Sequence, residues 1–229
     1  GHDASEYELP PLHVHQHTVE LEHNDAHGLF AMEAQTLSER RDARRASLIE
    51  RVRECARIVN ADVQPWVVWC DLNAEGDALT AAIDGAVQIS GADDPDVKER
   101  RLHDFSAGRI RVLVSKPSIC GFGLNWQHAS RMAFVGVTDS FESYYQAVRR
   151  EWRFGQTKPV HVHVFASNLE GAVVANLKRK ERDALAMAEA MAAETIQAVR
   201  SEIFGFSKDT NIYQPARTIA VPAFLFGGK

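Results

Sequence analysis

The sequence predicts an α/β protein, in which a mainly parallel sheet is covered by helices on both faces and is followed by a long C-terminal helix. Two observations lead to this prediction. Short apolar segments recur through the middle of the chain, as expected for strands that are covered on both faces. Segments of helical length separate them, and strands joined in this way pair in parallel through right-handed crossovers.

The strands are predicted from their apolar content. Near the N-terminus, Leu12, Val14 and Val19 stand among polar residues behind Pro10 and Pro11, which indicates an extended first strand. Short apolar runs follow it, and each is predicted to be a strand: 66–70, 86–89, 110–114, 131–135 and 160–165.

The helices are predicted from spacing and from start signals. Residues 33–60 are rich in charge and their apolar residues recur near helical spacing, so we expect one long amphipathic helix there. Asp94 and Pro95 open another helix, because proline is tolerated in the first turn. The predicted helices are 33–60, 75–83, 94–107, 141–153 and 169–204.

The composition is that of an ordinary soluble globular protein, with 45% hydrophobic and 25% charged residues in a chain of 229. The formal net charge of −5 does not indicate a nucleic-acid binder, although Arg and Lys cluster at 40–57, 98–111 and 149–158. The three cysteines lie far apart, which argues against a disulfide framework or a cysteine-based zinc site. No segment is apolar enough to span a membrane, and none has the pattern of a secretion signal. We therefore expect a cytoplasmic protein.

The segment from Tyr144 to Gln156 carries the strongest functional pattern. It has the spacing Q-x-x-x-R-x-x-R-x-G-Q, formed by Gln146, Arg150, Arg153, Gly155 and Gln156. Arginines three residues apart in a helix share one face. A guanidinium is always charged and offers paired donors that suit a phosphate. The pattern therefore favours phosphate chemistry over the alternative, a basic helix that only faces water.

A glycine-containing loop follows the predicted strand 110–114. Gly121 and Gly123 allow a close backbone approach to a ligand, and Lys116 offers a point charge to a phosphate. A plain glycine turn without a ligand is the alternative. The arginine segment follows a neighbouring strand and Asp139. Ligands of open α/β sheets gather beyond the carboxyl ends of the strands, so we expect both segments to meet at that edge.

Histidines alternate along the predicted first strand, so the imidazoles of His13, His15 and His17 share a face. Such a group could bind zinc or nickel. No fourth ligand is evident, so partly exposed strand residues are the favoured interpretation, and the same holds for His161 and His163.

The chain has no complete nucleotide-binding loop. The pattern G-x-x-x-x-G-K-[ST] does not occur, and no Asp-Glu pair closes an apolar strand where it would hold Mg²⁺. The sequence thus has residues suited to the outer phosphate of a nucleotide but none that would hold the nucleotide itself.

Together these residues resemble the second RecA-like domain of superfamily 2 helicases, closest to the Snf2-like branch and its phage-type DEAD/DEAH-box relatives. The arginine segment looks like motif VI of that family, usually Q-A-x-x-R-A-H-R-x-G-Q, and residues 120–125 look like motif V, G-G-x-G-[IL]-N. Residues 66–71 are similar to the motif IV strand, and residues 9–11 to the linker that leaves the first domain. The chain departs from the usual motifs at Cys120, Lys116–Ser118, Arg149 and Trp152.

The resemblance implies roles for individual residues. Arg150 and Arg153 would reach the γ-phosphate of an ATP held by the first domain. The residues implied to line the nucleotide site, or to couple it to nucleic acid, are Gln146, Gly121, Gly123, Asn125 and Asp139. Lys116 and Arg100 are expected to contact nucleic-acid phosphates. Trp126 could stack on a base and is a candidate nucleic-acid contact, and a core tryptophan is an interpretation of at least equal weight.

The implied function is that of the C-terminal motor domain of an ATP-dependent helicase or translocase. ATP and Mg²⁺ would be bound mainly by an N-terminal RecA-like lobe of the parent protein, and the nucleic acid is expected to be DNA. This chain alone is expected to be inactive. The alternative is a non-catalytic α/β module that binds a phosphorylated or protein partner. The implied domains are a linker with the first strand (1–30), the RecA-like domain (31–168), a helical extension (169–205) and an irregular tail (206–229).

Overall fold

The computed structural model describes residues 9–20, 42, 44–120, 125–136 and 140–168, together with residues 175, 179, 180 and 182. The chain divides into two compact units, Gly1–Asp183 and Ala184–Lys229, and every described residue lies in the first. Most of the helix predicted over 169–204, and the first part of the helix predicted over 33–60, therefore fall outside the described residues.

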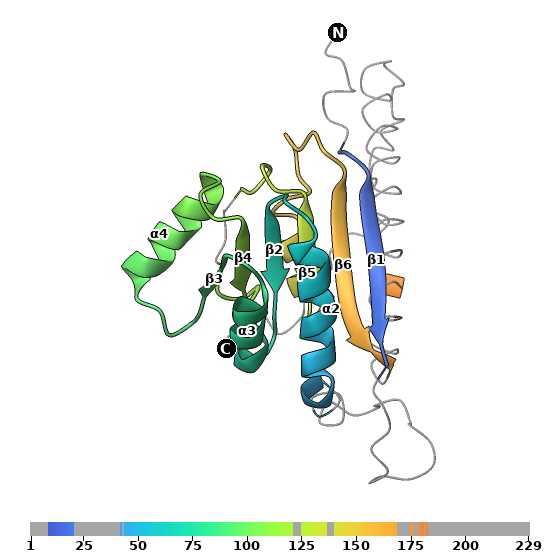
Figure 1. Ribbon diagram of the computed structural model, residues 1–229. Helices are drawn as coiled ribbons and strands as arrows, with labels where there is room; N and C mark the ends of the chain where they lie inside the picture. Colours follow the sequence, from blue (N-terminus) through green and yellow to red (C-terminus); the bar gives the residue numbers. More distant parts are fainter. Residues whose placement is uncertain are drawn as a thin grey trace, which may run out of the picture. The chain divides into compact units, whose positions relative to one another are not determined.

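The described residues form one six-stranded sheet in which every neighbouring pair of strands is parallel (Figure 1). The strand order is β1-β6-β5-β2-β4-β3. The strands are β1 Leu12–Val19, β2 Trp66–Trp69, β3 Ala86–Ile89, β4 Val112–Ser115, β5 Arg131–Phe134 and β6 Val160–Ser167. The central strands β2 and β4 are buried throughout, because helices cover both of their faces. The predicted fold class is confirmed.

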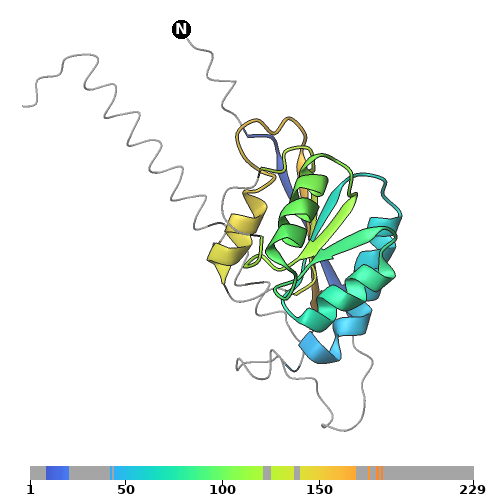
Figure 2. The same cartoon turned by 90° about the vertical axis from the view of Figure 1, so that its left-hand side faces the viewer.

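Helices pack on both faces of the sheet, and Figure 2 shows α2 (blue) and α5 (yellow) on opposite sides. The helices are α2 Leu48–Asn60, α3 Asn73–Ala82, α4 Pro95–Ser106 and α5 Phe141–Val148. One core lies between the sheet and α2 and α3, where Val52 and Leu79 are buried. The other lies on the side of α4 and α5 and contains Phe105, Trp126 and Tyr144. None of the helices in the described residues is long and apolar enough to cross a membrane.

Local signals explain where two of these helices begin. Asp94 caps α4, because its carboxylate accepts a hydrogen bond from the Asp96 amide at 2.9 Å, and Pro95 occupies the first turn as predicted. At the start of α3, one carboxylate oxygen of Glu75 accepts from the amides of Asp71 and Leu72 at 2.9 and 3.0 Å. Each carboxylate satisfies amides that have no partner within the helix.

Helix α5 ends earlier than the sequence predicts. The expected helix reaches residue 153, whereas α5 ends at Val148, so Arg150 and Arg153 lie in the turns that follow it. Beyond Val148 the backbone tightens, since the amides of Arg150 and Glu151 donate to carbonyls three residues earlier. The expectation that the two arginines share one helical face is therefore wrong.

Candidate functional site

The arginine segment lies at the edge formed by the amino ends of the strands. A crossover helix returns the chain to the start of the next strand, so the residues after α5 lead into β6. Two hydrogen bonds at this edge support that placement. The amide of Val160 donates to the carbonyl of Pro11, just before β1, and the amide of His161 donates to the carbonyl of Ser130, just before β5, both at 2.9 Å. The expectation that the arginine segment reaches the carboxyl edge is wrong, because the crossover carries it to the opposite edge.

Two segments meet there, 125–129 before β5 and 150–156 before β6, and we call them together the amino-edge site. The amide of Trp126 donates to the Arg150 carbonyl at 3.0 Å. The guanidinium of Arg153 donates from Nη1 to Oδ1 of Asn125. The side chain of Gln127 donates to the Phe154 carbonyl at 2.8 Å. The structure thus brings together the predicted site residues Asn125, Arg150 and Arg153.

The buried side chain of Gln156 connects the two segments of the amino-edge site by hydrogen bonds. Only 6% of it is exposed. Its Nε2 lies within hydrogen-bond distance of the carbonyls of Ala129, Gln127 and Glu151, at 2.9, 3.1 and 3.3 Å, and its Oε1 accepts from the Lys158 amide at 3.0 Å. A buried amide side chain with these partners ties segments together. The sequence pattern marked this residue without indicating such a role.

The two arginines differ in their surroundings. Arg150 is 9% exposed, and its guanidinium carbon lies 5.9 Å from the ring centre of Trp69 and 5.7 Å from that of Trp126. These distances suit cation–π contacts. Burial lowers the pKa of Arg150 from its ordinary value. Arg153 is more exposed, so it is the arginine that a ligand outside the domain can reach in this structure.

Trp126 is a core residue. It is fully buried, meets Phe105 edge to face with 5.3 Å between ring centres, and lies 6.0 Å from Trp69. Stacking on a base needs an exposed ring face. The candidate base-stacking role is therefore wrong, and the core interpretation, which had at least equal weight, describes this tryptophan. The packed ring of Trp126 also forms the surface against which the guanidinium of Arg150 lies.

Glu151 was not singled out by the sequence, yet it is an unusual residue of this site. Its side chain is fully buried, and neither carboxyl oxygen has a hydrogen-bond partner in the described part of the chain. Burial raises the pKa of Glu151 well above its ordinary value. Burial thus disfavours the charged form of Glu151, whereas the arginines of the segment carry positive charge. No sequence pattern separates this glutamate from an exposed one.

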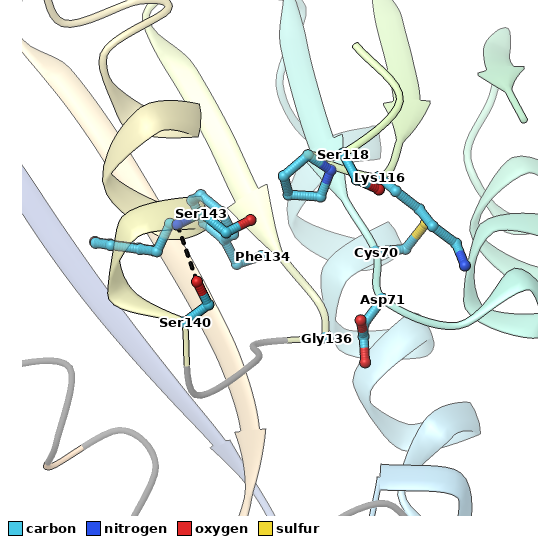
Figure 3. A pocket seen from close by; sticks show the side chains of 10 residues that line it. Cys70, Asp71, Lys116, Ser118, Phe134, Gly136, Ser140 and Ser143 are labelled. Carbon is cyan, nitrogen blue, oxygen red and sulfur yellow. Dashed lines mark hydrogen bonds between the residues drawn. The ribbon is translucent and has the colours of Figure 1, made fainter. Parts of the chain in front are cut away.

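A cavity of about 280 Å³ lies at the opposite edge, beyond the carboxyl ends of β2, β4 and β5 (Figure 3). Its lining includes Asp71, Lys116 and Ser118. The start of α5 also lines it, where the Ser140 hydroxyl accepts from the Ser143 amide at 3.3 Å. Lys116, a predicted phosphate contact, thus lines a cavity at the carboxyl edge.

A buried ion pair supports the wall of this cavity. Arg51 and Glu75 are both fully buried, with 2.8 Å between Nη2 and Oε1. Arg51 also donates to the Val135 carbonyl. Next to that carbonyl is Gly136, where an added Cβ would lie 2.4 Å from Oε2 of Glu75. Only glycine fits here, because the carboxylate of Glu75 occupies the space that a side chain would need.

Between Lys116, directly after β4, and Asn125, before β5, the chain passes from the carboxyl edge to the amino edge. Gly121 and Gly123 lie outside the described residues, as does Asp139. The other predicted site residues are separate from both edges: Gln146 is exposed on α5, and Arg100 is exposed on α4.

The histidines of β1 meet those of β6 across the strand pair. His15 and His161 are hydrogen-bonded at 3.0 Å, and His17 and His163 at 2.9 Å. Burial, with neighbouring cations, lowers the pKa of His163 to about 3, and burial lowers those of His17 and His161. No group of three or more metal-ligating side chains forms a metal site within the described residues.

Comparison with known proteins identifies the domain. Residues 70–155, from the end of β2 to the arginine segment, match the family described as "Helicase conserved C-terminal domain". This part of the chain is similar to helicase C-terminal domains. The resemblance to the second domain of superfamily 2 helicases is thereby confirmed, and the matched residues include Lys116, Asn125, Arg150 and Arg153.

Relatives match part of the chain. Over 97 residues it is 30% identical to the bifunctional helicase and thymine dioxygenase JBP2 of Leishmania braziliensis, a match that covers 42% of this chain and 9% of that protein. Over 70 residues it is 40% identical to ATP-dependent DNA helicase Q4 of Homo sapiens, covering 30% of this chain and 6% of that protein. The matched segments thus span less than a tenth of either relative.

Among solved structures, the C-terminal part of the Fun30 ATPase domain is similar, with a TM-score of 0.49 and 15% sequence identity. The match covers 57% of this chain and 44% of that chain.

Proposed function

We propose that this domain is the C-terminal motor lobe of an ATP-dependent helicase or translocase that acts on DNA. It works with an N-terminal RecA-like lobe of the same parent protein, which binds ATP and Mg²⁺. The family match supports this proposal, and so does the similarity to an ATP-dependent DNA helicase.

The observation that carries the proposal is the contact between Arg153 and Asn125 at the amino-edge site. It leaves a charged guanidinium partly exposed and held at one end by a neutral oxygen, so its other donors can meet an anion. Arg153 reaches the γ-phosphate of the ATP on the other lobe. Arg150 is the second arginine of the pair. It contacts the same phosphate once its side chain has moved away from Trp69 and Trp126. Arginines with this role raise turnover by ~10³–10⁵ in other nucleotidases.

The residues present suit a phosphate better than a metal ion. Guanidinium groups are permanent cations with paired donors, whereas the carboxyl of Glu151 is buried and its pKa is raised. Mg²⁺ is therefore held by the other lobe and by the phosphates, where it neutralises charge that develops during hydrolysis. Gln146, exposed on α5, and Asp139 help to position the nucleotide.

The carboxyl edge contacts the nucleic acid. Lys116, which lines the cavity, neutralises a backbone phosphate at this edge, and Arg100, exposed on α4, neutralises another away from it. The loop from Lys116 to Asn125, with Gly121 and Gly123, couples that contact to the arginines, because its two ends lie at opposite edges.

DNA binding by this chain tests the nucleic-acid half of the proposal. We expect weak binding whose logarithm falls linearly with the logarithm of the salt concentration. Lys116→Ala should reduce the magnitude of that slope by about 1, because one phosphate contact is lost. The exposed Lys158, at the other edge, provides the matched variant Lys158→Ala, which should keep the slope. Binding that does not depend on salt would contradict a backbone contact and would favour a protein-binding module.

The requirement for a second lobe is tested separately. The chain alone should show no ATP hydrolysis above background, whereas the protein that contains both lobes should hydrolyse ATP and be stimulated by DNA. Hydrolysis by the chain alone would contradict the division of labour between two lobes.

A further inference from the structure

The chain enters the domain beside the arginine segment. The indole Nε1 of Trp152 donates to the Pro10 carbonyl at 2.7 Å. One residue later, the Pro11 carbonyl accepts from the Val160 amide at 2.9 Å. Both prolines precede β1, so the point of entry is attached twice. One attachment is to β6, and the other is to the turn that carries Arg153.

The entering chain is stiff. Proline fixes its own φ angle near −65° and restricts the residue before it, so Pro10 and Pro11 together leave few backbone rotations that could absorb a displacement. Neither has an amide hydrogen, and the Pro10 carbonyl is the group that meets Trp152. A movement of the chain before Pro10 is therefore passed to the indole.

Trp152 is in turn well connected to the arginines. It lies between the fully buried Glu151 and the partly exposed Arg153. Its ring packs against the core on the α4 and α5 side, and the guanidinium of Arg149 lies 5.6 Å from its ring centre. A displaced indole must move the backbone next to Arg153, because interiors packed in this way do not deform freely.

We propose that Trp152 is a positioning residue. It couples the position of the Arg153 guanidinium to the position of the entering chain at Pro10. The inference rests on the proposed function. In that function the chain before Pro10 leads to the lobe that holds ATP. The bond from Trp152 to Pro10 then links the position of that lobe to the arginine that must reach its nucleotide.

Hydrogen exchange on this chain tests the link without any activity. Trp152→Phe keeps a ring but removes the donor. The matched control is Trp66→Phe, because Trp66 is buried in the other core, on the α2 and α3 side, and donates from its indole to Asp62 at 3.2 Å. Exchange of the amides in residues 12–19 and 150–156 should be about threefold to tenfold faster in Trp152→Phe, the effect of one lost hydrogen bond. Equal exchange in Trp152→Phe and in the unsubstituted chain would overturn the inference.

Steady-state kinetics of the protein that carries both lobes supplies the second test. Trp152→Phe should lower kcat for ATP and leave KM nearly unchanged, because the arginine acts after ATP has bound. Trp66→Phe should leave both constants unchanged. If Arg153→Ala abolishes turnover while Trp152→Phe leaves kcat unchanged, Trp152 has no positioning role. If Arg153→Ala leaves turnover unchanged, the proposed function itself fails, and the exchange measurement still decides whether Trp152 holds the entering chain.

Discussion

The guanidinium of Arg153 and the side-chain oxygen of Asn125 are joined by a hydrogen bond. Asn125 ends a loop that begins at the carboxyl-edge cavity, and Arg153 lies in the turn before β6. The bond therefore connects the proposed nucleic-acid contact, through one loop, to the proposed phosphate contact.

This contact leads to a prediction for Asn125→Ala in the protein with both lobes. Turnover should fall by about tenfold to a hundredfold, because a hydrogen bond to a charged group is typically worth ~1.5–3 kcal/mol. KM for ATP should change little. The matched control is Gln127→Ala, which removes another side-chain bond between the same segments without touching an arginine. Equal losses in the two variants would mean that Asn125 serves stability alone.

Glu151→Gln should change how stability depends on pH. The pKa of Glu151 is raised in the folded protein, so the unfolded chain releases its proton first as the pH rises. The free energy of unfolding should therefore fall as the pH rises above about 4.5, the ordinary value for glutamate. The glutamine variant lacks this loss and should be more stable at pH 8 by about 1–3 kcal/mol. Urea denaturation from pH 4.5 to 8 measures the difference, and identical pH profiles would contradict a buried, protonated carboxyl.

Breaking the buried pair of Arg51 and Glu75 should be costly. Glu75→Ala leaves the guanidinium of Arg51 without its carboxylate in a fully buried site. The free energy of unfolding should fall by about 3–5 kcal/mol. Glu54→Ala is the matched control, because the pair of Glu54 and Arg57 lies at the surface, and its effect should be far smaller. Denaturation midpoints of the two variants test this, and equal midpoints would contradict a structural role for the buried pair.

The histidines of β1 and β6 should make the domain sensitive to acid. The pKa of His163 is lowered to about 3 in the folded protein, so the unfolded chain binds its proton first as the pH falls. Stability should be lost as the pH falls from about 6.5 towards 3. His163→Phe keeps a ring beside His15 and His17 and should reduce this loss. Denaturation at pH 7.5 and pH 5 provides the test, and an unchanged difference between these two values would count against it.

The fold could be predicted because its strands are short apolar runs with clear borders. The predicted strand 86–89 matches β3, and Asp94 with Pro95 marked the start of α4 as expected. Buried parallel strands need apolar residues on both faces, and this requirement is visible in the sequence.

The site was harder to predict because it depends on contacts between distant residues. The spacing from Gln146 to Arg153 is compatible with a continuous helix, yet the chain leaves the helix after Val148, where Trp152 and Gln156 bond to Pro10 and to the segment before β5. A single sequence does not reveal such partners.

Two further errors have different origins. The sheet edge at which the arginine segment lies could have been inferred from the sequence, because a crossover helix always carries the chain back to the amino ends of the strands. Trp126 could not be assigned from the sequence, because a tryptophan after a glycine loop suits both a core and a base-stacking surface. Its burial against Phe105 decides the matter.

Single-turnover hydrolysis by the Arg153→Ala variant of the two-lobed protein tests the central claim most directly. ATP affinity should stay within about twofold, while hydrolysis should be slower by ~10³-fold or more. Arg149→Ala, which removes a neighbouring cation that lies over Tyr145 and Trp152, should keep the rate of hydrolysis. Unchanged hydrolysis in Arg153→Ala would contradict the claim that this guanidinium meets a nucleotide held by a second lobe.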